Sequence, residues 1–112
     1  MSTFLPSSLE EIQSLAYSRI KKKQPFRICG KGSRFTNLNF RKSDIGLIDV
    51  ISLRKFNAKR FFNPEDMVVG LEAGMSINKM QQLLAKKNMC LPINPWFRES
   101  CIGSVVASND FG

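Results

Sequence analysis

The chain has 112 residues, of which 43% are hydrophobic and 23% charged, proportions typical of a single globular domain. It lacks the run of about 18 apolar residues that a membrane span needs, and its N-terminal region carries acidic residues and three successive lysines where a secretory signal needs an apolar core. We therefore expect one domain over residues 1–112, in a soluble cytoplasmic protein with no transmembrane segment.

The cysteine and histidine content argues against a metal site. Cys29, Cys90 and Cys101 are far apart and lack CxxC spacing, and the sequence contains no histidine. We expect no bound metal, and we expect the cysteines to be free, buried thiols in a reducing compartment.

The formal net charge of +8 makes nucleic acid or an anionic ligand a natural partner. The basic residues are spread along the chain, however, and apart from Lys21, Lys22 and Lys23 they lie between structural signals. This distribution favours a solvated basic surface over a nucleic-acid tract, so no nucleic acid is expected as a partner.

The N-terminal part of the chain predicts a helix. Ser8 is placed to cap its first turn, and Glu11 is placed to bond back to the Ser8 amide. Apolar residues then recur at helical spacing, at Leu9, Ile12, Leu15, Ala16 and Ile20. The spacing predicts a helix to about Ile20 with one buried apolar face.

Short strands and a second helix follow. Residues 26–29 and 45–53 predict two strands, residues 63–66 a turn, and residues 67–73 a third strand. Ser76 then caps a helix whose apolar positions are Ile77, Met80, Leu83 and Leu84.

Residues 89–93 predict a last short strand after that helix. The order helix, strand, strand, strand, helix, strand indicates an α+β fold, a small sheet with flanking helices.

A glycine loop follows the strand at residues 26–29, with the sequence Gly30, Lys31, Gly32, Ser33, Arg34. Loops with little side-chain bulk expose backbone N–H groups that bind phosphate oxygens, and Lys31 and Arg34 add positive charge. The spacing is neither that of a P-loop nor that of a dinucleotide-binding fold. From these residues alone, a phosphate-binding loop and an ordinary turn after a strand both remain open.

The C-terminal segment at residues 103–109 consists mainly of small or compact side chains. A segment of this kind allows its backbone to lie flat against a planar cofactor. Composition alone also favours a buried terminal helix.

These segments together resemble the first half of the FAD domain of vanillyl-alcohol-oxidase (PCMH-type) flavoproteins, and most closely the FAD-binding subunit of bacterial glycolate oxidase. The resemblance runs from about Pro6 to Gly112. It rests on an ordered set of motifs: the helix start Ser8-x-x-Glu11, RICGKGS at 27–33, VISLRKFN at 50–57, NPEDMVV at 63–69, EAG at 72–74, LP at 91–92, and glycine, asparagine and glycine at 103, 109 and 112.

The resemblance implies FAD as the cofactor. Residues 30–34 (Gly30, Lys31, Gly32, Ser33, Arg34) correspond to the loop that holds the FAD pyrophosphate, and residues 103–109, with Gly103, Ser104 and Asn109, correspond to a second contact. The flavin of that family accepts a hydride from a 2-hydroxy acid or a similar alcohol. No residue of this chain is assigned as a catalytic acid or base.

The chain departs from the family at three points. Lys31 and Ser104 stand where the family usually has glycine, and the family's FAD domain continues well beyond the equivalent of Gly112. The resemblance therefore implies a partial domain, lacking the substrate cap and inactive alone, that works with other subunits of a glycolate oxidase-like complex or with a complementing C-terminal fragment. The charge of +8 favours an alternative, a basic binding or partner-interaction module without flavin chemistry, and a non-functional gene remnant is a third interpretation.

Overall fold

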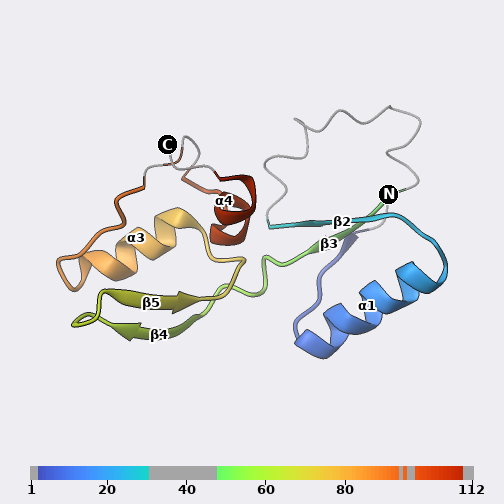
Figure 1. Cartoon of the computed structure of the whole chain (residues 1–112), viewed down its shortest axis with the longest axis horizontal. Coiled ribbons are helices and arrows are strands. Elements are labelled where there is room, and N and C mark those ends of the chain that lie inside the picture. The colour runs from blue at the N-terminus through green and yellow to red at the C-terminus, as the bar shows by residue number, and fades with distance from the viewer. Residues whose placement is uncertain (1–2, 31–47, 94, 96–97, 110–112) are drawn as a thin grey trace. The chain divides into compact units, whose positions relative to one another are not determined.

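The computed structural model describes residues 3–30, 48–93, 95 and 98–109. The chain divides into two compact units, Met1–Lys55 and Phe56–Gly112, each with its own small sheet and its own helix or helices (Figure 1). This architecture confirms the α+β class expected from the sequence. No helix in the described ranges is long and apolar enough to cross a membrane.

The first unit is built on a parallel sheet. Its elements in chain order are β1 (Thr3–Phe4), α1 (Leu9–Lys21), β2 (Phe26–Cys29) and β3 (Asp49–Ser52). The strands lie in the order β1-β3-β2, and both outer strands run parallel to β3. The predicted strand at 26–29 is confirmed, and β3 forms the second half of the strand predicted at 45–53, of which residues 45–47 lie outside the described ranges.

Helix α1 begins where the sequence predicts but is less buried than expected. The Ser8 hydroxyl accepts a hydrogen bond from the Glu11 amide at 3.2 Å, while the Glu11 carboxylate accepts from the Ser7 amide at 3.1 Å rather than from that of Ser8. No residue of α1 is fully buried, and Leu9 and Ile20 are 60% and 67% exposed. The prediction of a buried apolar face was wrong, since Ile12, Leu15 and Ala16 in the middle of α1 are only half-buried and the apolar residues near its two ends are exposed.

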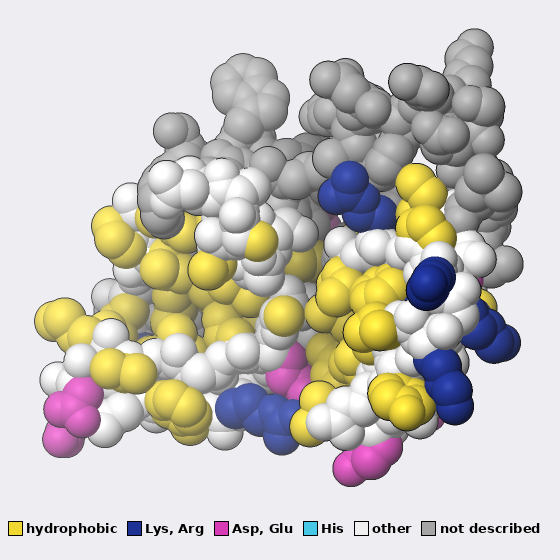
Figure 2. All heavy atoms as spheres, turned by 45° about the vertical axis from the view of Figure 1, so that its right-hand side comes forward, with side chains coloured by type: hydrophobic (Ala, Val, Ile, Leu, Met, Phe, Trp, Pro, Cys, Tyr) yellow, Lys and Arg dark blue, Asp and Glu magenta, His cyan; other side chains and the backbone are white. Residues whose placement is uncertain are grey.

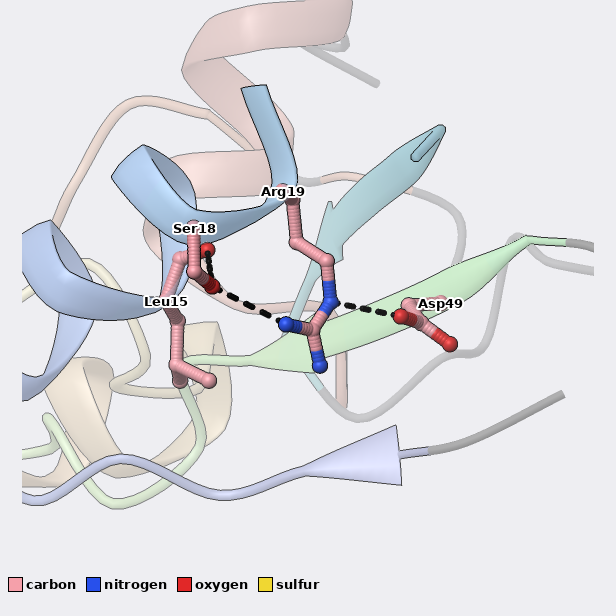
Figure 3. Close-up of polar contacts among 4 residues, drawn as sticks. All are labelled: Leu15, Ser18, Arg19 and Asp49. Atoms are coloured by element: carbon pink, nitrogen blue, oxygen red, sulfur yellow. Dashed lines mark hydrogen bonds and ion pairs between the residues drawn. The ribbon is translucent and has the colours of Figure 1, made fainter. Parts of the chain in front are cut away.

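Arg19 links helix α1 to Asp49 of strand β3 (Figure 3). Its Nε donates to Asp49 Oδ2 at 2.6 Å, and both side chains are only 16% exposed. The guanidinium also lies 4.7 Å from the centre of the Phe4 ring, and its Nη1 donates to Ser18 Oγ at 2.9 Å. One cation of α1 therefore contacts β1 and β3 at once, and low exposure strengthens its attraction to the carboxylate.

The second unit contains an antiparallel hairpin and two helices. The hairpin strands are β4 (Lys59–Asn63) and β5 (Val68–Leu71), and the helices are α3 (Ile77–Ala85) and α4 (Ile102–Ser108). The buried core of this unit consists of Met75, Ile77, Met80, Leu84 and Val105.

Local signals in the second unit were predicted well. The turn at 63–66 forms, with the Asp66 amide donating to Asn63 Oδ1 at 3.3 Å. Ser76 caps α3 by accepting from the Lys79 amide at 3.1 Å. The sequence interpretation did not predict β4, whose partner is β5.

The strand predicted at residues 89–93 is wrong. In place of a neighbouring strand, the Gln81 side chain of α3 bonds both backbone groups of Leu91, accepting from its N–H at 3.0 Å and donating to its C=O at 3.3 Å. A side-chain amide thus satisfies the polar groups that a sheet partner would otherwise satisfy.

Replacing Asp49 with asparagine tests the role of Arg19. The variant leaves a nearly buried guanidinium without its counter-charge, and we expect the free energy of unfolding of the first unit to fall by about 1 to 3 kcal/mol. Amide hydrogen exchange at residues 26–29 and 49–52, read by mass spectrometry, should accelerate accordingly. Arg60→Gln is the control. Arg60 also pairs with a carboxylate, that of Glu72 at 2.8 Å, but its side chain is 68% exposed. This substitution should therefore lower the free energy of unfolding by less than about 1 kcal/mol. Unchanged exchange in the Asp49 variant would contradict this role.

Candidate cofactor-binding site

The glycine loop leaves the sheet beside the end of β3. The parallel register pairs Cys29 with Ser52, so the residues that follow the two strands start side by side. The Ser52 hydroxyl donates to the Gly30 carbonyl at 2.6 Å, and both residues are buried. The Leu53 amide donates to the Cys29 carbonyl at 2.8 Å, which extends the pairing by one more bond. The first residue of the loop is therefore held in place by β3.

This position is where a ligand is expected in a parallel sheet. Connections that leave the carboxyl ends of adjacent parallel strands meet at one edge, and ligands of α/β sheets bind outside that edge. Gly30 is the one predicted loop residue that the structure places, since Lys31, Gly32, Ser33 and Arg34 lie outside the described ranges. The anchoring residue, Ser52, was missed from the sequence, where its only signal is a polar side chain among the apolar residues of a predicted buried strand.

Gly103 lies in the first turn of α4 and contacts the chain itself. Its amide donates to the Ala73 carbonyl at 2.9 Å, and the preceding amide of Ile102 donates to the Met75 carbonyl at 2.8 Å. A Cβ at position 103 would lie 2.9 Å from Ala73 Cβ and 3.1 Å from Ala73 O. The absence of a side chain thus permits a close approach inside the second unit, and the Gly103 amide is already occupied.

Ser104 and Asn109 lie at opposite ends of the same helix. Ser104 is half-buried, and its hydroxyl bonds to no other described residue, although its carbonyl accepts from Ser108 Oγ at 2.6 Å. Asn109 is exposed and ends α4 in the left-handed conformation, with φ 56° and ψ 41°, donating its amide to Val105 and Val106. Asparagine tolerates this conformation better than most residues, so the cap by itself accounts for its presence.

The segment at 103–109 is therefore helical rather than flat. It also differs from a buried terminal helix, because Val105 is its only buried residue and Val106 is 70% exposed. Gly103, Ser104 and Asn109 lie together on α4 of the second unit, whereas Gly30 belongs to the first unit.

The cysteines take three different environments. Cys101 is buried, Cys29 is half-buried and Cys90 is exposed, and none of the three forms a disulfide. The expectation of buried thiols is confirmed for Cys101 and is wrong for Cys90, because the strand predicted over residues 89–93, which would have contained Cys90, does not form.

Comparison with known families and structures identifies the domain type. A family model described as FAD binding domain matches residues 2–112. The chain belongs to this FAD-binding family. FAD is accordingly the cofactor of the domain, which confirms the cofactor expected from the sequence.

Solved structures share the fold of this FAD-binding domain. Two crystal forms of alkyldihydroxyacetonephosphate synthase, P212121 and P1, match with TM-scores of 0.80 and 0.77, each at 22% identity over 98% of this chain. The matched region makes up 21% and 22% of those chains, so this chain spans about a fifth of their length. No curated protein matches the sequence.

The described residues fit FAD in part. Gly30 is buried and held by the Ser52 hydroxyl, and Ser104 offers a hydroxyl with no partner among the described residues. The Gly103 amide does not fit a direct contact, because Ala73 already accepts its hydrogen bond.

Replacing Gly103 with alanine separates its packing role from any cofactor role. Alanine normally stabilises a helix by about 1 kcal/mol relative to glycine, but here the added carbon meets Ala73 backbone and Cβ atoms. Overpacking of this kind costs about 1 to 3 kcal/mol, so we expect a net loss of stability in the second unit without any ligand. Urea unfolding measures it, and Ala73→Gly in the same chain should recover part of the loss. Ala107→Ser, an exposed change on α4, is the control. Unchanged stability in the Gly103 variant would contradict the packing explanation.

Proposed function

We propose that this chain supplies the pyrophosphate-binding part of the FAD site of a flavin-dependent oxidoreductase. The observation that carries the proposal is the anchoring of Gly30 by Ser52 at the carboxyl end of β2, directly before a loop with two basic residues and a glycine. Membership of the FAD-binding family supports the choice of ligand.

In this proposal, the loop binds the anionic centre of the cofactor. Backbone N–H groups of Lys31, Gly32 and Ser33 donate to the phosphate oxygens, and the charges of Lys31 and Arg34 offset the two negative charges. Ser104 of the second unit, whose hydroxyl is not bonded within the described part of the chain, is a separate candidate for a polar contact with the cofactor. When bound, FAD supplies a hydride acceptor, and the chain binds and orients it.

The finer assignment rests on the sequence motifs. We propose a cytoplasmic protein similar to the FAD-binding subunit of bacterial glycolate oxidase, with a 2-hydroxy acid as the class of substrate. Because the chain spans about a fifth of the matched synthase chains, we propose that further polypeptide completes the flavin site and supplies the substrate site.

A panel of cofactor fragments tests the loop assignment. We expect the 112-residue chain to retain FAD weakly, ADP to compete for the site, and riboflavin to compete poorly, because the loop contacts the pyrophosphate. Arg34→Gln should weaken FAD and ADP about tenfold, the effect of one charge-assisted contact. Lys22→Gln, with the same charge change in an exposed position, should have little effect.

Two outcomes of this panel contradict parts of the proposal. Competition by riboflavin but not by ADP would move the contact away from the pyrophosphate. Tight, stoichiometric FAD on the chain alone would disprove the need for further polypeptide. Steeply salt-dependent binding to DNA, without flavin retention, would instead favour the basic binding module.

Replacing Ser52 with alanine tests the anchor separately. The change leaves a buried Gly30 carbonyl without its 2.6 Å donor, which costs on the order of 1 to 2 kcal/mol and loosens the start of the loop. We expect weaker ADP binding with an unchanged response to riboflavin, measured by isothermal titration. Ser14→Ala, an exposed change on α1, is the matched control, and equal ADP affinity in both variants would remove Ser52 from the site.

A further inference from the structure

The second unit contains a small pocket between the β4–β5 hairpin and α3. Its volume is about 160 Å³. Its apolar walls are Phe62, Val69, Leu71, Met80, Leu83 and Leu84. None of the residues predicted to bind the cofactor lines it.

Three lysines complete the lining of this pocket: Lys59, Lys86 and Lys87. All three are exposed, and none of their ammonium groups forms an ion pair or hydrogen bond within the described part of the chain. Glu72, which follows β5, is not available to them, because it pairs with Arg60 at 2.8 Å and accepts from the Ala58 amide at 2.9 Å. The pocket is therefore apolar inside and carries positive charge without a local counter-charge.

A register shift brings Lys59 to this face of the hairpin. Phe62 pairs with Val69, and Lys59 pairs with Leu71. The two β4 residues are three positions apart in sequence, whereas their two β5 partners are only two positions apart. The irregularity lies between Lys59 and Phe61. In a regular ladder, residues three apart face opposite sides, so the bulge places Lys59 beside the apolar wall.

We propose that this pocket binds a short alkyl carboxylate. The apolar walls remove the alkyl chain from water, and the three ammonium groups attract the carboxylate at the opening. Lys86 and Lys87 follow the C-terminal end of α3, where the helix dipole repels anions, and their charges offset that repulsion. The volume equals about five water-sized groups, which fits a chain of roughly five or six carbons. The proposal concerns a site separate from the flavin loop.

Hexanoate is the probe. Hexanol is the matched ligand without the charge, and acetate is the matched ligand without the alkyl chain. We expect saturable binding of hexanoate to the 112-residue chain, with a dissociation constant on the order of millimolar for so small a ligand. Methyl NMR signals of Val69, Leu71 and Leu83 should shift. Hexanol should bind on the order of tenfold more weakly, since three exposed ion pairs each add a modest amount, and acetate should not saturate.

A charge-matched pair of variants tests the lysines. The triple variant Lys59→Gln, Lys86→Gln, Lys87→Gln should weaken hexanoate about tenfold and leave hexanol unchanged. The control, Lys21→Gln, Lys22→Gln, Lys55→Gln, removes the same charge from exposed positions that do not line the pocket, and it should change hexanoate binding by less than about twofold.

Three results would overturn the proposal: no saturation by hexanoate, equal binding of hexanol and hexanoate, or shifts confined to residues outside the pocket. The comparison of ligands on the unaltered chain decides the matter even where a variant is unstable. Neither ADP nor FAD should displace hexanoate. Absence of hexanoate binding would therefore not contradict the flavin proposal, and absence of flavin binding would not contradict the pocket proposal.

Discussion

The parallel pairing of β2 with β3 is the constraint on which the candidate site depends. A parallel ladder aligns the carboxyl ends of two strands that are far apart in sequence, and here it brings Gly30 and Ser52 within hydrogen-bonding distance across 22 positions. An antiparallel pairing would place the end of β3 beside the start of β2, and the Gly30 carbonyl would lose its buried donor. The position of the loop is thus a consequence of strand direction as well as of glycine content.

The same sequence motif can carry a packing role and a ligand role, and the two must be separated residue by residue. Gly103 belongs to the glycine-containing turn that the resemblance connects with FAD, yet its missing side chain is explained by Ala73 and its amide by the Ala73 carbonyl. Asn109 is likewise explained by the left-handed end of α4. Ser104 is the member of this group whose polar atom has no role in the described fold, which makes it the most informative position for cofactor contact.

Features that depend on residues close together in sequence could be predicted, whereas features that depend on the pairing of strands could not. The caps at Ser8 and Ser76 and the turn at Asn63 depend on residues three positions apart, and all three were predicted. The missed features lack a local signal of this kind. β1 exists only as a neighbour of β3, and β4 pairs irregularly with β5, so neither shows a clean alternation along its own residues.

The candidate site was predictable to the same extent. The glycine loop was found because its residues are consecutive, whereas its anchor, Ser52, lies 22 positions away and is revealed only by the register of two strands. The strand wrongly predicted at 89–93 also reflects a contact that the local pattern does not reveal. Its apolar pattern is compatible with a strand, but the Gln81 side chain, ten positions away, supplies the partner for Leu91.

Shallow burial explains why a polar contact matters so much in the first unit. The apolar side chains of α1 are half-buried or exposed, and hydrophobic surface is visible on the face shown in Figure 2, so burial alone gives α1 little preference for one orientation on the sheet. Hydrophobic attraction is also non-directional, whereas the bond from Arg19 to Asp49 specifies both a position and an angle. Asp49 pairs with Phe26 at the start of β2, and Ser52 pairs with Cys29 at its end. The ion pair at one end of the β2–β3 ladder and the Ser52 bond at the other therefore fix the strand from which the cofactor loop departs.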